Sequence, residues 1–199
     1  MNNSAVTQGL LIVVSGPSGA GKGTVVKQLA QNENYALSIS ATNRTPRVGE
    51  LNGREYFFVS HFEFEELING NNLLEHAEYN GNYYGTPLKY VQHQIADGKV
   101  VILEIEVVGG LQVKEKFPDA ALIFLAPPSM DELKRRLVYR NTEDMETINS
   151  RLQIASWEFA QAEKYDYFVI NDTVDTAVDH INAIVTAERL KSTRRRQIC

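Results

Sequence analysis

The sequence predicts an α/β fold in which helices flank a mostly parallel sheet. Apolar, strand-like runs alternate with amphipathic, helix-like runs along the chain, and this alternation is typical of such sheets. The run at 100–108, VVILEIEVV, is rich in β-branched residues and suits a strand that is buried on both faces. Because ligands of this fold class bind outside the carboxyl ends of the strands, the same prediction places a candidate site at that edge.

A glycine-rich turn between the first strand-like run and the first helix-like run is the strongest motif. In the stretch LLIVVSGPSGAGKGTVVKQL at 10–29, Gly16, Gly21 and Lys22 fit the frame G-x-x-x-x-G-K. Small residues in this frame let successive backbone N–H groups turn inward around an anion, and the helix that follows adds the positive end of its dipole. We expect a phosphate cradle with Lys22 as a mobile positive charge; the alternative is an ordinary strand-to-helix turn.

One position departs from the frame and bears on metal binding. The residue after Lys22 is Gly23, where the frame has a magnesium-binding serine or threonine, and Thr24 follows one place later. The metal then has three options: Thr24, water, or an acidic residue such as Glu104 or Glu106 near a strand end. We favour water and nucleotide oxygens, because Mg²⁺ readily keeps several waters. No direct protein ligand is expected on this view, and Thr24 is the alternative.

Composition and charge exclude several classes of function. The chain has 199 residues, enough for one compact domain with a sizeable core, and is 43% hydrophobic and 23% charged. Its net charge of −5 argues against nucleic acid or an anionic membrane as a partner, since both reward a broad basic surface. Cys199 is the only cysteine, which excludes an intramolecular disulfide, and the polar start lacks the apolar run of a signal peptide. We expect a cytoplasmic protein.

Short elements and turn signals follow the first helix, which is expected to open near Gly23. Asn52-Gly53 signals a tight turn, and Ser60 with Glu63 forms a capping box that opens a helix. The expected elements are strands at 35–41, 56–59, 73–79 and 82–85, and helices at 60–68 and 88–96. These hairpin signals predict that 38–87 forms a small inserted α+β subdomain.

Longer elements return in the second half of the chain. Gly109 and Gly110 are expected to end the buried strand, and Ser129 with Glu132 forms a second capping box. The expected elements are strands at 100–108, 120–125 and 167–170, and helices ending near 117 and at 129–140, 148–163 and 174–190. We expect a lid at about 129–151, around a polar break at 141–146, and a core built from 1–37, 88–128 and 152–199.

Arginines cluster in two polar segments. Arg44 and Arg47 lie in the segment TNRTPR, and each can grip a phosphate with a planar fork of donors. Arg136, Arg140 and Arg151 flank the expected lid, and the first two share a helix face. Like charges spaced this way repel by a few tenths of a kcal/mol, roughly, which hints at an anion between them. The alternative for Arg44 and Arg47 is that they are solvated surface charges.

Four segments, taken together, carry a resemblance to a known family. The phosphate loop GPSGAGKGT, the run SATNRTPRVGELNGREYFFV, the segment LLEHAEYNGNYYGTP and the stretch FLAPPSMDELKRRLVYRNTE occur in this order and spacing. The chain thereby resembles the guanylate kinases over nearly its whole length, through INDTVDTA at 170–177. The resemblance implies a P-loop NTPase-type sheet with a GMP-binding subdomain and a lid. It also implies transfer of the γ-phosphoryl group of ATP to GMP, and to dGMP, with Mg²⁺ as cofactor.

The resemblance implies three groups of site residues. GMP contacts are implied for Ser40, Arg44, Arg47, Tyr56, Glu75, Tyr84, Thr86 and Glu104. ATP contacts are implied for Gly16, Pro17, Ser18, Gly19, Ala20, Gly21, Lys22, Gly23, Thr24, Arg136, Asn171 and Asp172. Catalytic roles around the transferred phosphoryl group are implied for Lys22, Arg47, Arg136, Arg140 and Arg151. Glu75 also makes chemical sense by itself, because a carboxylate can accept bonds from both guanine donors, a pair that adenine lacks.

The chain departs from the family pattern at four positions. Glu104 and Glu106 stand where many relatives have aspartate, Val108 replaces a frequent glutamine, and Asn141 replaces a frequent glycine. None of these changes removes a phosphate-binding charge. We therefore expect an altered rate or affinity before a loss of activity.

Two other functions remain open on the sequence alone. Guanylate-kinase-like domains of scaffold proteins bind protein partners without catalysis, but their phosphate loops are typically degraded, whereas Lys22 and the arginines persist here. The run Gly21-Lys22-Gly23-Thr24 also resembles adenylate kinase, against which Glu75 argues. The four histidines show no paired ligand spacing, so no transition-metal site is expected. The expected partners are ATP and GMP, bound by a monomer or a homodimer, with no nucleic acid and no membrane.

Overall fold

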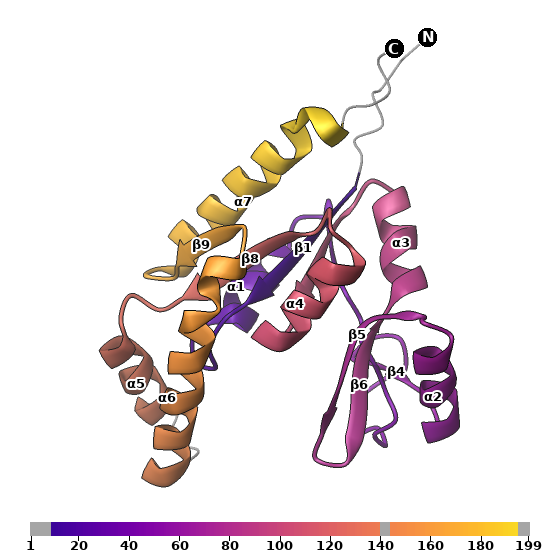
Figure 1. Ribbon diagram of the computed structural model, residues 1–199, viewed down its shortest axis with the longest axis horizontal. Coiled ribbons are helices and arrows are strands. Elements are labelled where there is room, and N and C mark those ends of the chain that lie inside the picture. Colours follow the sequence, from indigo (N-terminus) through magenta and orange to yellow (C-terminus); the bar gives the residue numbers. More distant parts are fainter. Residues whose placement is uncertain (1–8, 140–143, 195–199) are drawn as a thin grey trace.

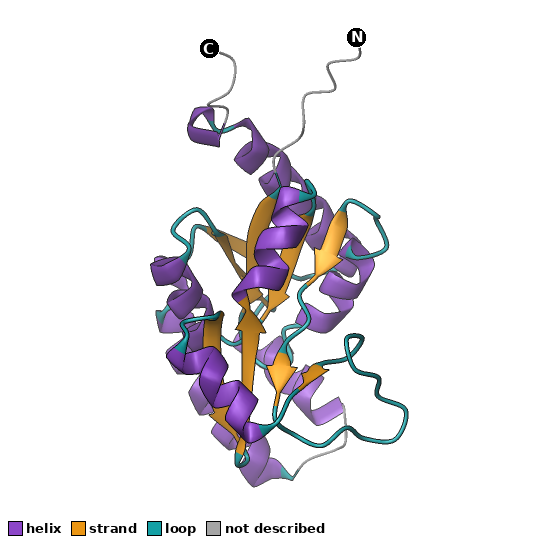
Figure 2. Cartoon of the chain, turned by 90° about the vertical axis from the view of Figure 1, so that its right-hand side faces the viewer, coloured by secondary structure: helices purple, strands orange, loops and turns teal. Residues whose placement is uncertain are grey.

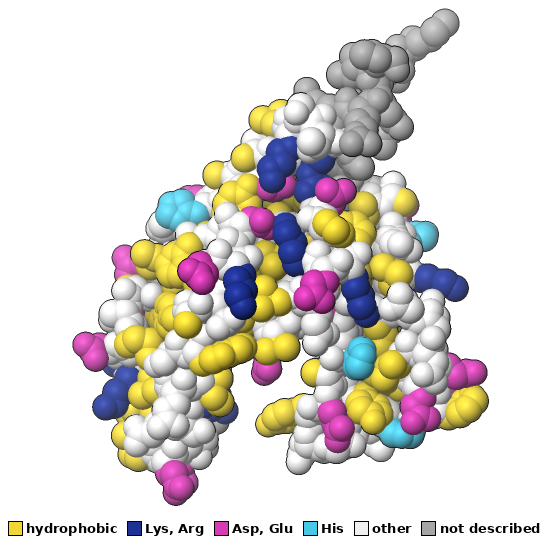
Figure 3. All heavy atoms as spheres, viewed as in Figure 1, with side chains coloured by type: hydrophobic (Ala, Val, Ile, Leu, Met, Phe, Trp, Pro, Cys, Tyr) yellow, Lys and Arg dark blue, Asp and Glu magenta, His cyan; other side chains and the backbone are white. Residues whose placement is uncertain are grey.

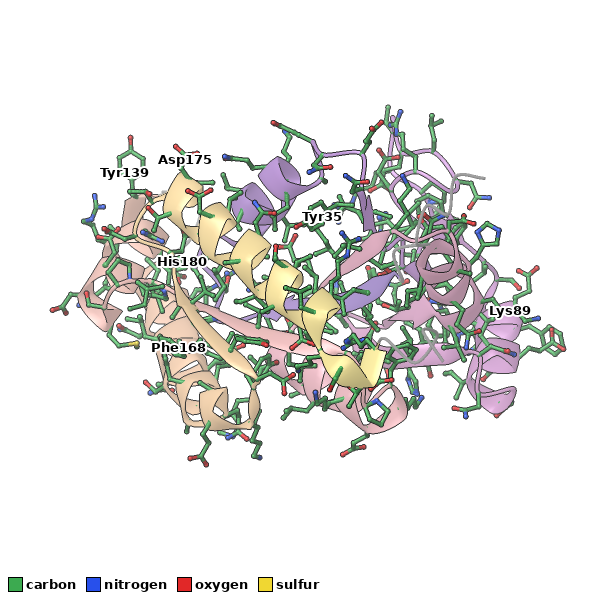
Figure 4. The ribbon with its side chains drawn as sticks, turned by 90° about the horizontal axis from the view of Figure 1, so that it is seen from above. Tyr35, Lys89, Tyr139, Phe168, Asp175 and His180 are labelled. Atoms are coloured by element: carbon green, nitrogen blue, oxygen red, sulfur yellow. The ribbon has the colours of Figure 1, made fainter. Side chains whose placement is uncertain are left out.

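A central sheet with two projecting lobes makes up the molecule. The computed structural model describes residues 9–139 and 144–194. Figure 1 shows that the lobes project from the same side of the central body, one built from α5 and most of α6, the other from a second sheet and α2. Seen from above, Tyr139 at the end of α5 lies at one end of the molecule near Asp175, and Lys89 of α3 lies at the other end (Figure 4).

The central sheet has five strands, all parallel, which confirms the predicted fold class. Its order is β2 (Tyr35–Leu37), β7 (Val100–Glu104), β1 (Leu10–Ser15), β8 (Ala121–Ala126) and β9 (Tyr167–Ile170). In the β1–β7 register Val14 pairs with Glu104, so the strand end that carries Glu104 lies beside the start of the glycine-rich turn. The carboxyl edge of the sheet therefore gathers the turn, Glu104 and the residue after β9, Asn171, whose N–H donates to Ala126 O at 2.7 Å.

Helices cover both faces of this sheet. Helices α1 (Lys22–Leu29) and α7 (Val174–Leu190) pack on one face, and α3 (Leu88–Ala96), α4 (Val107–Lys116) and the end of α6 pack on the other. Strand β1 is buried at every position, with Ile12 in one core and Val13 in the other. Because each such side chain contributes about 1.5–3 kcal/mol on burial, the phosphate loop starts from a rigid strand.

A second, mixed sheet forms one lobe. Its order is β4 (Phe57–Phe58), β3 (Ala41–Thr42), β6 (Asn82–Pro87) and β5 (Leu73–Tyr79), and α2 (His61–Asn69) packs on it through Phe64. The loop 43–56 between β3 and β4 stands out from this sheet (Figure 2). All four strands lie inside the segment expected to form the inserted subdomain; its boundaries remain a prediction.

The other lobe is a helix pair with a small core of its own. Helices α5 (Met130–Tyr139) and α6 (Met145–Ala160) bury Leu133, Leu137 and Ile148 between them. The space-filling view shows a wide hollow between this lobe and the second sheet (Figure 3). No helix in the described part of the chain is long and apolar enough to cross a membrane.

The strand expected at 35–41 is two strands in two different sheets. β2 pairs with β7 in the central sheet, whereas β3 pairs with β4 and β6 in the second sheet. The chain crosses between the sheets at 38–40, where Ser38 N–H still donates to Ile102 O and Ser40 O already accepts from Phe57 N–H. Alternation continues through the crossing, so local pattern does not reveal it.

The prediction of one strand over 100–108 was wrong beyond Glu104, where β7 ends. Val107 begins α4, and Gly109 and Gly110 lie inside this helix instead of ending the strand. The glycine at 110 serves close packing: a Cβ atom there would lie 2.5 Å from Tyr165 Oη and 2.9 Å from Ser15 Oγ. The helix therefore approaches the end of β1 more closely than a larger residue would allow.

The two predicted capping boxes have different outcomes. At Ser60 both bonds with Glu63 are present, which confirms the first box. At Ser129 only half forms, because Glu132 N–H donates to Ser129 Oγ at 3.1 Å while the Glu132 carboxylate binds arginines. Helix α6 begins at Met145, earlier than expected, because Asp144 caps it with a bond from Thr147 N–H at 2.8 Å.

Three-residue 3-10 turns follow both long C-terminal helices. The helix expected at 148–163 ends at Ala160, and Ala162–Lys164 forms the turn η1. After α7 the chain forms η2 (Ser192–Arg194). Arg194 of this turn and Lys191, the residue before it, both pair with the buried carboxylate of Glu188. The basic segment is therefore tied to α7 as far as Arg194.

Candidate active site

The glycine-rich turn adopts the conformation that a phosphate cradle needs. Gly16, Gly19 and Gly21 have φ values of 143°, 95° and 91°, in the region that favours glycine. Gly21 is also the N-cap of α1, and a Cβ atom there would lie 2.5 Å from Asn171 Nδ2. Lys22 donates from Nζ to Gly16 O at 2.5 Å and Pro17 O at 3.2 Å, so its ammonium curls back over the loop. The loop and the start of α1 together present N–H groups and a cation to one point.

Arg136 and Asn171 join this loop from two other elements. Asn171 Nδ2 donates to Ala20 O at 2.7 Å, and Arg136 donates from NH1 to the same carbonyl at 3.3 Å and from NH2 to Asn171 O at 3.0 Å. Glu132, one turn earlier on α5, accepts from Arg136 Nε at 2.8 Å. The bonds from Arg135 and Arg136 lower the pKa of Glu132 to about 2, so this carboxylate stays ionised and orients Arg136.

Arg151 reaches the tip of the loop from α6. Its NH1 donates to Ser18 Oγ at 2.7 Å, which connects the α5–α6 lobe to the phosphate loop. Arg140, predicted to share the face of Arg136, lies outside the described residues, as does Asn141. Two of the three arginines expected around the lid are therefore placed at the phosphate loop by observed bonds.

A cavity opens beside the loop on the side of α7. It measures about 410 Å³ and is lined by Gly19, Gly21, Thr24, Arg135, Arg136, Tyr139, Asn171, Asp172 and Val174. This volume falls in the range of small-molecule sites. Six of the sequence-predicted ATP residues share this wall with Arg135 and Tyr139, which the sequence did not single out. A second hollow, on the outward face of α5 between Asp131 and Tyr139, contains none of the predicted residues.

Glu104 lies against the position where the loop lacks a hydroxyl. A Cβ atom at Gly23 would be 3.5 Å from Glu104 Oε1 and 3.7 Å from Oε2. Desolvation raises the pKa of Glu104, and the nearby charge of Lys22 offsets part of this rise. The described residues include no group of three or more His, Cys, Asp or Glu side chains that could hold a metal by themselves.

A second cluster of residues predicted to bind phosphate lies on the other lobe. The guanidinium carbon of Arg44 lies 5.5 Å from the ring centre of Tyr56 and 5.8 Å from that of Phe58, and the Tyr56 and Tyr84 rings meet edge to face at 5.9 Å. Arg44 NH2 donates to both carboxylate oxygens of Glu50 at 2.9 Å. Three of the predicted phosphate residues, Arg44, Tyr56 and Tyr84, are thus brought together. Arg47 is exposed in the same loop.

The residue predicted to read the base, Glu75, has a buried carboxylate. Glu75 is 7% exposed, and its Oε1 accepts from the fully buried Thr86 Oγ1 at 2.7 Å. Oε2 lies toward α4, 3.4 Å from where a Cβ atom of Gly109 would be. Burial raises the pKa of Glu75, and bonds from Thr86 and the charge of Lys116 partly offset it. Ser40, also predicted here, is half-buried at the crossing between the sheets.

The predicted residues thus form two groups on opposite sides of the hollow. The first surrounds the phosphate loop, and the second lies on the second sheet and loop 43–56. The hollow in Figure 3 separates the two lobes that carry them.

Two acidic residues that organise the site were missed from the sequence. Glu132 orients Arg136, and Glu50 binds both Arg44 and the backbone of Arg47, whose N–H donates to Glu50 Oε2 at 2.7 Å. Both had a local signal. Glu132 lies four residues before Arg136, the spacing of a helical ion pair, and Glu50 lies three residues after Arg47 in a turn-rich loop.

Comparisons with known proteins agree with this geometry. The sequence model of a family described as guanylate kinase matches residues 8–188. A guanylate kinase of Halalkalibacterium halodurans is 54% identical over 188 residues, 94% of this chain and 92% of the relative. One of Bacillus subtilis is 54% identical over 189 residues, 94% of this chain and 93% of the relative. The crystal structure of guanylate kinase from Anaplasma phagocytophilum has a TM-score of 0.73 at 34% identity, covering 94% of this chain and 90% of that one.

Proposed function

This chain belongs to the guanylate kinase family and phosphorylates GMP with ATP as donor, and from that premise we propose a role for each group of site residues. The observation that carries the proposal is that two clusters of cationic side chains lie on opposite walls of one hollow. The phosphate loop with Arg136 and Arg151 is on one wall, and Arg44 with its neighbouring tyrosines is on the other. Two nucleotides can then approach each other phosphate to phosphate.

ATP occupies the phosphate loop in this proposal. Backbone N–H groups of the phosphate loop surround its β- and γ-phosphates, and Lys22 leaves the carbonyls of Gly16 and Pro17 to follow the transferred group. Thr24, Asn171 and Asp172 line the adjoining cavity and face the adenosine part.

GMP occupies the second sheet. Arg44, Arg47, Tyr56 and Tyr84 bind its phosphate, and Glu75 reads the base. Thr86 holds Glu75 Oε1, so that the carboxylate is fixed when it accepts from guanine N1–H and the exocyclic amine. Ser40 and Glu104 complete the contacts that the family resemblance assigns to GMP.

The reaction needs no covalent intermediate with the protein. A GMP phosphate oxygen attacks the γ-phosphorus of ATP, the bond to the β-γ bridging oxygen breaks, and ADP leaves with that oxygen. Charge spreads over the equatorial oxygens in the transition state, where Lys22, Arg47, Arg136 and Arg151 supply preorganised cations. Arg140 is assigned to the same set by sequence alone.

The residues present fit a divalent cation, which we propose to be Mg²⁺. Glu104 provides hard oxygen atoms beside Gly23, the kind of ligand that Mg²⁺ prefers. When bound, the metal would supply positive charge that neutralises part of the charge of the nucleotide phosphates. We propose that water and nucleotide oxygens supply most of its ligands, with Glu104 nearby and Thr24 as the alternative protein ligand.

Closure of the lobes completes the site. Because the α5–α6 pair has its own small core, it can move as a unit that carries Arg136 and Arg151. Closure over both nucleotides would also exclude water, which otherwise competes with GMP for the phosphoryl group. We place the reaction in the cytoplasm, with ATP and GMP as the partners.

An assay of base choice tests the proposal. ADP release from ATP is measured with GMP, dGMP, AMP and UMP supplied separately. We expect turnover with GMP and dGMP and little with AMP or UMP. Equal turnover with AMP would show that Glu75 does not select guanine.

A further inference from the structure

Loop 43–56 carries an acidic residue that the mechanism above does not use. We propose that Glu50 is a positioning residue for the GMP phosphate, which it serves by holding Arg44 and Arg47 in their binding geometry. The inference rests on the roles proposed above for these two arginines.

Glu50 is bonded to both arginines at once. Its two oxygens each accept from Arg44 NH2 at 2.9 Å, and Oε2 also accepts from the backbone N–H of Arg47 at 2.7 Å. The Glu50 N–H donates in turn to Arg47 O at 3.1 Å, which closes the turn from both sides. The side chains of Arg44 and Glu50 are only 15% and 16% exposed, so solvent screens this pair less than a surface ion pair.

These bonds occupy some of the N–H donors of the Arg44 guanidinium and leave the others for a ligand. Both carboxylate oxygens of Glu50 accept from NH2, and Thr45 O accepts from NH1 at 2.8 Å. The Nε–H group and the donors of NH1 and NH2 that these bonds leave are available to a ligand. The rings of Tyr56 and Phe58 fix the plane of the same group. Arg44 is therefore presented to the substrate in one orientation.

Arg47 is fixed by its backbone and not by its side chain. Its guanidinium makes no hydrogen bond or ion pair with any residue in the part of the chain that the structure describes, while its N–H and carbonyl are both bonded to Glu50. Pro46 before it restricts the loop further. The free fork of Arg47 thus starts from an anchored backbone, which lowers the ordering cost of binding phosphate.

A competing role for Glu50 would be that of an internal substitute for phosphate, which GMP must displace. Displacement would leave a carboxylate that is 16% exposed with only the backbone N–H of Arg47 as partner, and unpaired charges of this kind are costly. The Glu50 bonds therefore persist when GMP binds. The two roles predict opposite changes in the KM for GMP.

Glu50→Gln tests the proposal by steady-state kinetics. The amide keeps the shape but turns an NH₂ group toward donors of Arg44 or Arg47. We expect the KM for GMP to rise about tenfold, with the KM for ATP unchanged and kcat altered by less than about threefold. Glu50→Asp should give an intermediate KM, since it keeps the charge with a shorter reach. An unchanged or lower KM for GMP in Glu50→Gln would overturn the inference, and a lower one would make Glu50 a competitor.

Glu55 provides a matched control in the same loop. It accepts from Arg54 Nε at 2.6 Å and Leu51 N–H at 2.7 Å, the same combination of an arginine and a backbone donor, without contacting Arg44 or Arg47. Glu55→Gln should leave the KM for GMP at the wild-type value. If it raises the KM as much as Glu50→Gln, loop stability explains both effects and the inference fails.

An Arg44→Ala background separates this inference from the proposed function. If Arg44→Ala leaves the KM for GMP unchanged, the phosphate role of Arg44 itself is wrong. If Arg44→Ala raises the KM, most of the Glu50→Gln effect should vanish in the double variant, because Glu50 acts through Arg44. Full additivity of the two changes would contradict the inference while leaving the proposed function intact. Should Glu50→Gln not fold, Glu50→Asp carries the test, and a wild-type KM in that variant would contradict the inference.

Discussion

The carboxylate of Glu104 faces Gly23 at the start of α1, with Oε1 3.5 Å from where a Cβ atom of Gly23 would lie. Gly23→Ser would place a hydroxyl within reach of both this carboxylate and the proposed metal. We expect activity to stay intact and the magnesium requirement to stay equal or fall modestly, whereas Thr24→Ala should change it little. Magnesium titrations of ADP release from both variants check this. A large rise in the requirement of Thr24→Ala would show that the threonine hydroxyl binds the ion.

Glu75 should determine base choice. Glu75→Gln keeps the shape but replaces one acceptor with a donor, which would face a guanine donor in a buried place. The cost of about 1–3 kcal/mol corresponds to a loss of about 5- to 150-fold in kcat/KM for GMP. Glu78→Gln, an exposed change on the same strand, is the control. If kcat/KM for GMP is the same in wild type and Glu75→Gln, guanine is read elsewhere.

The pH dependence of GMP binding should follow the same carboxylate. Burial raises the pKa of Glu75 above its ordinary value, so protonation begins at a higher pH than for an exposed glutamate. Because guanine needs the ionised form, the KM for GMP should rise as the pH falls through this raised pKa. The stability contribution has the opposite sign: it is full below the unfolded pKa and lost as the pH rises through the folded one. Titration of the GMP phosphate contributes equally to wild type and to Glu75→Gln, so the difference between their KM profiles reports Glu75. Identical KM profiles for the two would contradict the prediction.

Arg151 should act mainly in the transition state. Arg151→Ala removes a donor that reaches the phosphate loop at Ser18, and we expect kcat to fall about a hundredfold with a much smaller change in ATP affinity. Arg151→Lys should not restore the rate fully, because lysine lacks the planar fork. Lys134→Ala, an exposed change on α5, serves as the control for charge. Equal losses of binding and turnover would make Arg151 a ground-state contact.

Two adjacent glycines of α4 should respond differently to alanine. Gly110→Ala would place a Cβ atom 2.5 Å from Tyr165 Oη, and we expect unfolding free energy to fall by about 1–3 kcal/mol. Gly109→Ala meets Glu75 Oε2 at 3.4 Å, an ordinary contact, and gains helix propensity of up to about 1 kcal/mol. Denaturant titrations of both variants check this. Equal stability of the two would show that α4 shifts to accept the methyl group.

Local chemistry explains what the sequence could predict. Ser60 with Glu63 predicted a helix start because both partners of the cap lie within one turn, and β5, α3, β9 and α7 have the bounds expected. The strand at 35–41 could not be divided in advance, because its two halves differ only in their distant pairing partners. The β-branched pair at 107–108 favours a strand locally, and only packing of Gly110 on Tyr165 makes a helix there understandable.

The site residues, too, were predictable only where the signal was local or came from the family resemblance. Lys22 and the glycines were predictable because the phosphate loop is a contiguous motif, and Arg44 and Glu75 followed from the family resemblance. Glu50 and Glu132 were missed because a carboxylate repels an anion and is therefore not expected beside an anion site. Only the structure shows that each one is paired with an arginine. Arg140 lies outside the described residues, and its role remains a prediction.

The chain enters the second sheet through β3 and leaves it through β6, and these two strands pair with each other, Ala41 with Gly85. A segment whose two ends lie side by side can be exchanged without stretching or threading the rest of the chain. The second sheet, proposed to select the base, can thus vary independently of the central sheet, which is proposed to bind ATP. New monophosphate preferences can therefore arise by replacing residues 41–87 as a block, while the strand, loop and helix that cradle ATP stay as they are.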